Sequence, residues 1–383
     1  MSDPRAPAPL PKSSRDTRID ALRGLFLVIM AAVHVPTPLS RWLHEPFGYV
    51  SAAEGFVFLG ACLAGFVYSK VRRRHGAAVM NAGLFARMRK IYFVHLGVLV
   101  ATALIVWPLG GRVTPLGNHF HDFLQHPWAS LALMPLLLHQ PPLFDILPLY
   151  IIFFALTPAV LRVAERRGWA IVLGLSAAVW LVAQFQPFAH LTADLSHRSP
   201  LRLSAFNLLA WQALWIGGLA TGETLMREPL AMRKHRRWLM APALLVIAAG
   251  LLCRHGILLR PTMVPHFLFW VDKWRLGPLR ALDVAAWALF LWSWSPQPPR
   301  ALTAPTALLG RHSLAVFALH IPLAIVASTA IQLHRFSAGA QVAIGAAVIG
   351  AMFAFAARID SGRWLPRAPR LWWNAARARL APR

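Results

Sequence analysis

The first long apolar run of the sequence contains two residues that could do chemistry together, Arg23 and His34. An ionisable group inside a membrane costs several kcal/mol and is a functional candidate for that reason. If this run is a helix, the eleven steps between the two residues make about three full turns and rise about 16 Å. Both side chains then point to one face, with the arginine near one end and the histidine deeper, toward the other.

This face would combine an anion-binding group with a possible general base. The guanidinium of Arg23 can hold a phosphate or carboxylate through two parallel hydrogen bonds. The imidazole of His34 can accept a proton from a hydroxyl at neutral pH. The alternative is a structural role, in which Arg23 reaches the membrane surface and His34 is a hydrogen-bonded residue inside a helix bundle. Spacing alone leaves both interpretations open. The other ionisable candidates in apolar runs are Asp20, Glu54, His95, Asp145, Asp283 and His320.

The elements that must position these residues are predicted to be membrane helices. The chain has 383 residues, of which 57% are hydrophobic and 14% charged, against about 25% charged in a soluble domain. Most apolar runs approach the roughly 20 residues that cross a bilayer. We therefore expect an all-α, polytopic membrane protein with about ten transmembrane helices. The runs fall at 19–36, 52–69, 91–109, 143–161, 169–188, 204–222, 238–253, 281–295, 312–333 and 340–357. The run at 128–139 is too short to span and should lie at the interface or re-enter.

The distribution of Lys and Arg predicts the orientation of these helices. With the N-terminus inside, 28 Lys and Arg fall in cytoplasmic segments and 10 in outer segments, a strong positive-inside bias. Both termini are then cytoplasmic, in a bacterial inner (cytoplasmic) membrane. The net charge of +25 reflects this topology, so we expect a lipid bilayer as partner and no nucleic acid. Residues 1–18 read as a disordered cytoplasmic tail, 19–358 as the membrane domain, and 359–383 as a basic, aromatic interfacial tail.

Two stretches of the sequence resemble the acyltransferase-3 superfamily. RIDALRGLFLVIMAAVH resembles the first-helix signature of that superfamily, in which an arginine and a histidine are separated by ten residues. LGRHSLAVFALHIPL resembles its late motif, a Gly–Ser pair followed by an aromatic residue and a histidine. Gly310, Ser313, Phe317 and His320 occupy those positions.

Three further stretches are similar to the OpgC branch of the superfamily. These are EGFVFLGACLAGFVY, DILPLYIIFFALTP and DKWRLGPLR. In the first of them, Gly60–Ala61 stands where the branch has Ser before Gly. Together the matching stretches run from about residue 15 to residue 322. The family is associated with adding succinyl groups to osmoregulated periplasmic glucans.

The resemblance implies transfer of an acyl group from cytoplasmic acyl-CoA, specifically succinyl-CoA, to glucan hydroxyls at the outer face. Acyl-CoA is then a co-substrate, and no bound cofactor and no metal are expected. His34 would be the base, with Glu54 as the first candidate and Asp145 as the second for a carboxylate that fixes its tautomer. His320 matches the late motif and is a further candidate site residue. Four basic residues are expected to hold CoA: Arg23, Arg87, Arg89 and Lys90.

Other functions remain open on the sequence. Intramembrane ionisable groups also suit a transporter or flippase of an envelope glycan or lipid. The same fold could move acetyl to another envelope glycan, or the chain could be a non-catalytic partner of a glucan synthase. His119, His121, Asp122 and His126 have a spacing that could bind a metal, but a polar loop facing the glycan is the preferred interpretation. Cys62 and Cys253 are expected to be packing residues.

Overall fold

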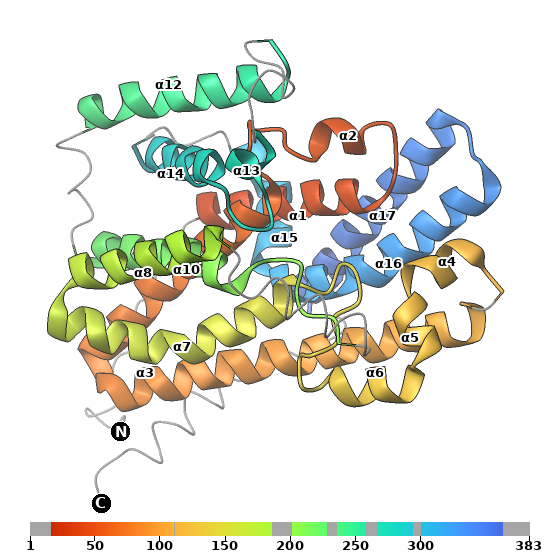
Figure 1. The fold of residues 1–383 in the computed structure, drawn as a ribbon, viewed down its shortest axis with the longest axis horizontal. Helices are drawn as coiled ribbons and strands as arrows, with labels where there is room; N and C mark the ends of the chain where they lie inside the picture. The colour runs from red at the N-terminus through yellow and green to blue at the C-terminus, as the bar shows by residue number, and fades with distance from the viewer. Residues whose placement is uncertain are drawn as a thin grey trace, which may run out of the picture.

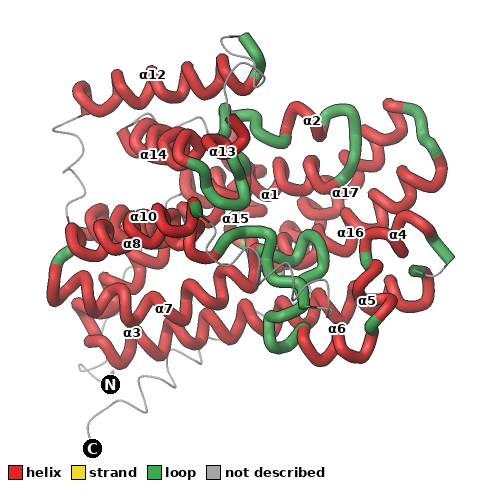
Figure 2. Tube along the Cα trace, viewed as in Figure 1, coloured by secondary structure: helices red, strands yellow, loops and turns green. Residues whose placement is uncertain are grey.

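The computed structural model describes residues 17–110, 112–185, 201–227, 236–257, 267–293 and 300–362, and within them the protein is helical (Figures 1 and 2). The only β-type pairing in this part of the chain is an isolated bridge between His139 and Arg202. The helices are α1 (Thr17–His34), α2 (Ser40–Leu43), α3 (Ala52–Leu109), α4 (Thr114–His119), α5 (His121–Gln125), α6 (Pro127–Leu133), α7 (Ile146–Arg167), α8 (Trp169–Gln184), α10 (Leu208–Arg227), α12 (Arg236–Arg254), α13 (Phe267–Val271), α14 (Pro278–Ser293), α15 (Arg300–Arg311), α16 (Ser313–His334) and α17 (Ala338–Asp360).

Several of these helices have the length and composition of membrane spans. Four described helices qualify, namely α3, α7, α16 and α17, and α8 and α12 are shorter apolar helices. Each of the ten expected runs overlaps a helix, so the all-α expectation is confirmed at that level. The expected tails fall mostly on residues 1–16 and 363–383, which lie outside the described residues.

The basic segment at 70–90 differs from the prediction. Because it separates the predicted spans at 52–69 and 91–109, it was expected to be a loop, but it is helical on both sides of Gly76 and belongs to the 58-residue α3. Gly76 has φ of 82°, a conformation that glycine adopts at little cost, and it bends the helix there. The prediction of a loop is wrong because Lys and Arg are good helix formers and do not by themselves end a helix.

Glycines bring the helices that carry the candidate residues into close contact. A side chain at Gly24 of α1 would overlap the carbonyl of Thr306, and one at Gly310 of α15 would overlap the carbonyl of Asp20. On α10, a side chain at Gly222 would overlap the carbonyl of Cys62 in α3. Small residues at such crossings let helix backbones approach, which is how helices associate in lipid. The close packing fixes α1 against α15, and therefore fixes the position of Arg23.

The far end of α1 is held by α16. The Ser328 hydroxyl donates to the carbonyl of His34 at 2.8 Å, which satisfies one of the free carbonyls at the end of the helix. Leu27 of α1 and Phe317 of α16 are buried between the helices. As a result, the last turn of α1 faces the middle of α16, where His320 lies.

Candidate functional site

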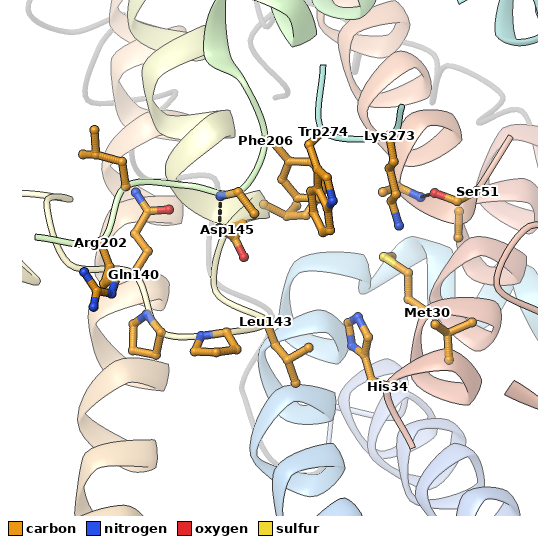
Figure 3. A pocket seen from close by; sticks show the side chains of 18 of the residues that line it. Met30, His34, Ser51, Gln140, Leu143, Asp145, Arg202, Phe206, Lys273 and Trp274 are labelled. Atoms are coloured by element: carbon orange, nitrogen blue, oxygen red, sulfur yellow. Dashed lines mark hydrogen bonds between the residues drawn. The ribbon is translucent and has the colours of Figure 1, made fainter. Parts of the chain in front are cut away.

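A cavity of about 540 Å³ opens at the end of the bundle where α1 finishes and α3 and α7 begin (Figure 3). Its walls come from several parts of the chain that are distant in sequence. They include Met30 and His34 of α1, Ser51 to Ala53 at the start of α3, the segment His139 to Ile146, Arg202 to Phe206, Lys273 and Trp274, and Phe317 of α16. The run at 128–139, expected at the interface or re-entrant, contains most of α6, and its last residue, His139, lines the cavity.

His34 forms a pair with His320 at the wall of this cavity. Nδ1 of His34 and Nε2 of His320 are 3.1 Å apart, and the rings stack with centroids 5.2 Å apart. The other ring nitrogen of His320, Nδ1, lies 2.6 Å from the carbonyl oxygen of Phe317. His320 is fully buried, while the ring of His34 points into the cavity (Figure 3).

This geometry selects the tautomers of both neutral rings. A carbonyl oxygen can only accept, so Nδ1 of His320 carries its proton and donates to Phe317. Nε2 of His320 is then the acceptor, and Nδ1 of His34 must donate to it. Nε2 of His34 is left with a lone pair. The arrangement presents that atom as a base, with a histidine in the orienting role that a carboxylate often has.

Arg23 lies about 16 Å from His34 along α1 and does not line the cavity. It donates a hydrogen bond to the hydroxyl of Ser313, and its guanidinium is 5.8 Å from the ring centroid of Phe56. Ser313 belongs to the late sequence motif, so the structure joins the first-helix motif to the late motif here. Arg23 and His34 thus both contact α16, through Ser313 and His320.

Of the other three basic candidates, Arg87 shares an electrostatic neighbour with Arg23. Both lie within electrostatic range of Tyr150, whose hydroxyl donates to the carbonyl of Phe56 at 2.7 Å. Arg87 is half-buried, whereas Arg89 and Lys90 are exposed on the outside of α3. Arg23 and Arg87 therefore both act electrostatically on Tyr150, and the remaining two residues lie at the surface.

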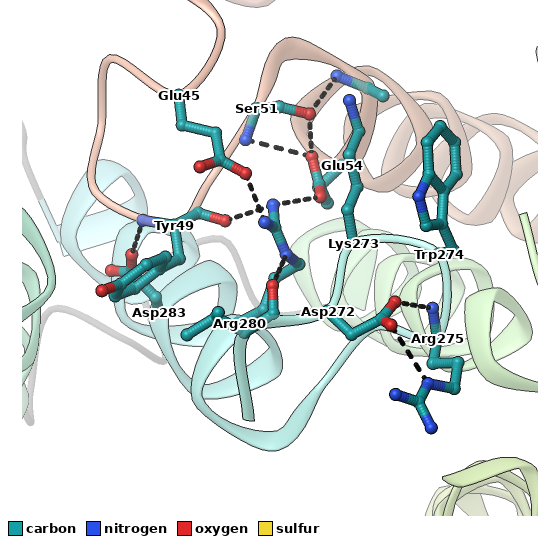
Figure 4. A network of polar contacts seen from close by, with 12 residues as sticks. Glu45, Tyr49, Ser51, Glu54, Asp272, Lys273, Trp274, Arg275, Arg280 and Asp283 are labelled. Carbon is teal, nitrogen blue, oxygen red and sulfur yellow. Dashed lines mark hydrogen bonds and ion pairs between the residues drawn. The ribbon is translucent and has the colours of Figure 1, made fainter. Parts of the chain in front are cut away.

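The structure places Glu54 in a buried ion cluster (Figure 4). Its Oε1 accepts from Arg280 at 2.9 Å, and its Oε2 accepts from the backbone N–H of Ser51 at 3.0 Å and from the Ser51 hydroxyl. Arg280 also donates to Glu45, which in turn accepts from Arg254 at 2.6 Å. The carboxylate expected to orient His34 is thus bound to Arg280 and caps α3.

Glu45, in the loop before α3, shows how strongly this cluster is coupled. Burial raises the pKa of its carboxyl, but the guanidinium groups of Arg280 and Arg254 outweigh burial and hold that pKa below its usual range. Arg280 is 3% exposed and donates as well to the carbonyls of Tyr49 and Val271. The donors and acceptors of this cluster are therefore used largely within it.

Asp145, the second candidate carboxylate, does line the cavity with His34. Its Oδ1 accepts a hydrogen bond from the backbone N–H of Ala205 at 2.7 Å, whereas Nδ1 of His34 is paired with His320. Asp283 accepts from the backbone N–H of Tyr49 at 2.8 Å beside the ion cluster. Asp145 shares the site with His34, and Asp283 belongs to the cluster.

Sequence reasoning missed two groups of the cavity. Asp122 and Arg202 form a two-pronged ion pair, with nitrogen–oxygen distances of 2.5 and 2.7 Å. Lys273 follows α13 and points into the cavity (Figure 3). Both basic residues had been counted only as outer-loop charges, although Lys273 lies within the DKWRLGPLR stretch. The described residues contain no group of three or more His, Cys, Asp or Glu side chains that could hold a metal ion.

Comparison with known proteins identifies the family. Residues 15–364 match the family model described as OpgC protein. This match covers most of the chain and confirms the resemblance inferred from the motifs. Neither the curated proteins nor the solved structures contain a match to this sequence.

Proposed function

This chain belongs to the OpgC protein family, and from that premise we propose that it is a membrane O-acyltransferase that succinylates periplasmic glucans. The donor is succinyl-CoA on the cytoplasmic side and the acceptor is a glucan hydroxyl on the periplasmic side. The observation that carries the proposal is the His34–His320 pair, which leaves Nε2 of His34 as a base in a cavity large enough for a sugar.

The reaction follows from that base. The oxygen of a glucan hydroxyl attacks the thioester carbonyl carbon of succinyl-CoA, and its proton passes to Nε2 of His34. The tetrahedral intermediate collapses, the carbon–sulfur bond breaks, and the proton on His34 is delivered to the departing sulfur. The products are a succinyl ester of the glucan and free CoA. Because His320 accepts from Nδ1 of His34, it stabilises the imidazolium that forms between the two steps.

Orientation in the membrane supports a donor and an acceptor on opposite sides. We propose ten spans with both termini cytoplasmic, counting the two arms of α3 separately, as the positive-inside bias indicates. Arg23 and Arg87 then lie toward the cytoplasm, where CoA phosphates would arrive, and Arg89 and Lys90 add charge at the surface. The cavity and His34 lie toward the periplasm, about 16 Å away along α1.

The cavity also offers groups suited to the sugar. Asp145 and Gln140 can bind hydroxyls, and Trp274 and Phe206 present aromatic rings on which a sugar can stack. We assign Glu54 a structural role, since Arg280 and Ser51 occupy its carboxylate. Its contribution to catalysis is then indirect, through the placement of the start of α3 beside His34.

The test is the mass and charge of periplasmic glucans from a deletion strain that expresses the wild-type protein, His34→Gln or His334→Gln. His334 is exposed at the end of α16 and does not line the cavity, so its variant is the matched control. Membrane levels of all three proteins are measured. We expect succinyl mass and added negative charge with the wild type and His334→Gln, and neither with His34→Gln. Identical glucans in every strain, the deletion included, would overturn the proposal.

A further inference from the structure

Lys273 differs from the other cation of the cavity wall. Arg202 is bound through two hydrogen bonds to the carboxylate of Asp122. Among the described residues, no carboxylate lies within ion-pair distance of the Lys273 ammonium, which lies over the ring of Trp274, 5.7 Å from the centroid. Lys273 thus brings to the cavity a positive charge that no anion of this part of the chain pairs with directly.

The acidic residues nearest to Lys273 are already occupied. Glu54 and Glu45 lie within electrostatic range of it, but both accept hydrogen bonds from Arg280, and Glu45 also accepts from Arg254. Burial lowers the pKa of the Lys273 ammonium, because the charged form has lost water. An anion that enters the cavity would therefore give the Lys273 ammonium the negatively charged partner that the described residues do not provide.

The ammonium and the proposed base share one part of the cavity. Lys273 is within electrostatic range of His34, and Figure 3 shows both side chains pointing into the same space, with Met30 and Ser51 on the neighbouring wall. A thioester carbonyl placed at His34 therefore has a cation near the far end of a short acyl chain. Met30 offers an apolar surface for the methylene groups between the two ends.

We propose that Lys273 binds the free carboxylate of the transferred acyl group and so selects a dicarboxylic, succinyl-type acyl chain over an uncharged chain of the same length. This inference rests on the proposed function and adds to it the residue that determines acyl specificity. The occupant is an acyl carboxylate rather than a CoA phosphate, because Arg23, which we propose for the phosphates, lies about 16 Å from His34 along α1. It is an anion rather than a sugar hydroxyl, because an ammonium has donors only and gains most from a negative acceptor.

The experiment compares two donors of equal chain length with the full-length protein in reconstituted membranes. Succinyl-CoA carries the terminal carboxylate and butyryl-CoA lacks it. The variants are Lys273→Gln, Lys273→Arg and the control Arg275→Gln. Arg275 lies two residues from Lys273, and its side chain pairs with Asp272 outside the cavity, so the control removes a nearby charge that does not line the site. We expect kcat/KM for succinyl-CoA to fall roughly 10- to 100-fold in Lys273→Gln, as expected for loss of a hydrogen bond to a charged group.

The same variant should transfer butyryl groups at least as well as the wild type. Lys273→Arg should keep most of the preference for succinyl-CoA, and Arg275→Gln should keep all of it. Equal losses with both donors in Lys273→Gln would overturn the inference, since the lysine would then act on the thioester or on folding. Unchanged rates with both donors would overturn it as well.

A binding measurement separates this inference from the proposed function. Non-reactive thioether analogues of succinyl-CoA and butyryl-CoA are titrated into the wild type and Lys273→Gln by calorimetry. If the wild type transfers neither acyl group but binds the succinyl analogue about 10-fold or more tightly through Lys273, the proposed function fails and the carboxylate site stands. If the wild type binds both analogues equally, the carboxylate site fails, whatever the result of the transfer assay.

Discussion

Two buried polar regions lie side by side at the cavity end of this protein, and they differ in how they use their hydrogen bonds. In the ion cluster, Glu45, Glu54 and Arg280 bond to one another and to nearby backbone groups. In the histidine pair, one side of His320 is fixed by Phe317, but His34 keeps a ring nitrogen for the cavity. The first region is closed on itself, whereas the second is open to a ligand.

The comparison teaches that the cost of burying an ionisable group does not by itself identify a catalytic residue. That cost selected Glu54 and His34 alike from the sequence. The two residues differ in whether other groups of the protein already occupy all their hydrogen-bonding positions. A saturated carboxylate has little capacity left for chemistry, while an imidazole with one fixed nitrogen and one free one is prepared to move a proton.

The largest expected effect comes from the open region. His34→Gln should lower kcat for acyl transfer about 10²- to 10⁴-fold, the usual contribution of a general base, while unfolding in detergent is unchanged. The measurement is transfer of labelled succinyl groups by purified protein at equal folded concentration. A variant that retains more than a tenth of the wild-type rate would show that the base lies elsewhere.

A mutation in the closed region should lower the stability of the protein. Arg280→Met leaves the carboxylates of Glu45 and Glu54 buried without their main cation and should destabilise the protein by about 3–5 kcal/mol. Unfolding is followed in detergent by loss of near-UV circular dichroism. The matched variant Arg275→Met removes a more exposed pair with Asp272 and should cost about 1 kcal/mol or less. Equal effects of the two variants would mean that the cluster is not what holds α14 against α3.

An intermediate effect is expected where His320 orients the base. His320→Phe removes the acceptor for Nδ1 of His34 and should lower kcat about 10- to 100-fold, in the range seen for groups that orient a functional histidine. KM for succinyl-CoA should stay the same. His320→Gln keeps an acceptor oxygen and should recover part of the rate. A loss in which Gln and Phe behave alike, or in which KM rises instead, would argue for a packing role.

The smallest expected effect is the pH dependence of stability, which tests the charge on Glu45 in the closed region. The pKa of Glu45 is held below its ordinary value of 4.5 by its arginine partners. Its contribution to stability is therefore fully present above that ordinary value and is lost as the pH falls through the lowered pKa. Unfolding in detergent between pH 6 and 3 should show this loss in the wild type. Glu45→Gln should be less stable at pH 6 and show a flatter dependence on pH.

The sequence predicted the helices and the shared face of α1 because both depend on local patterns. Apolar runs of span length give helices, and the spacing of Arg23 and His34 fixes their relative direction. The pairing of His34 with His320 was within reach, since both matched motifs of one superfamily. The helical continuation of α3 through its basic segment was missed, because positive charge reports the side of the membrane and not the local conformation.

The partners of single side chains could not be predicted, because they come from distant parts of the chain. Arg280, the cation that occupies Glu54, is 226 residues away from it. Arg202 reaches Asp122 across 80 residues. Lys273 looked like one of several outer-loop charges, and only the folded chain shows that it enters the cavity. The periodicity of a sequence predicts which residues share a face over a few turns of one helix. It does not predict contacts between residues so far apart in the chain.

The central claim is that one protein moves an acyl group from a cytoplasmic thioester to a periplasmic hydroxyl with His34 as the base. The most direct measurement uses sealed inside-out membrane vesicles with glucan trapped in the lumen and labelled succinyl-CoA added outside. The account predicts that label appears on lumenal glucan with the wild type and not with His34→Gln at equal protein level. Labelling that is equal with both proteins, or that requires donor and glucan on the same side of the membrane, would contradict it.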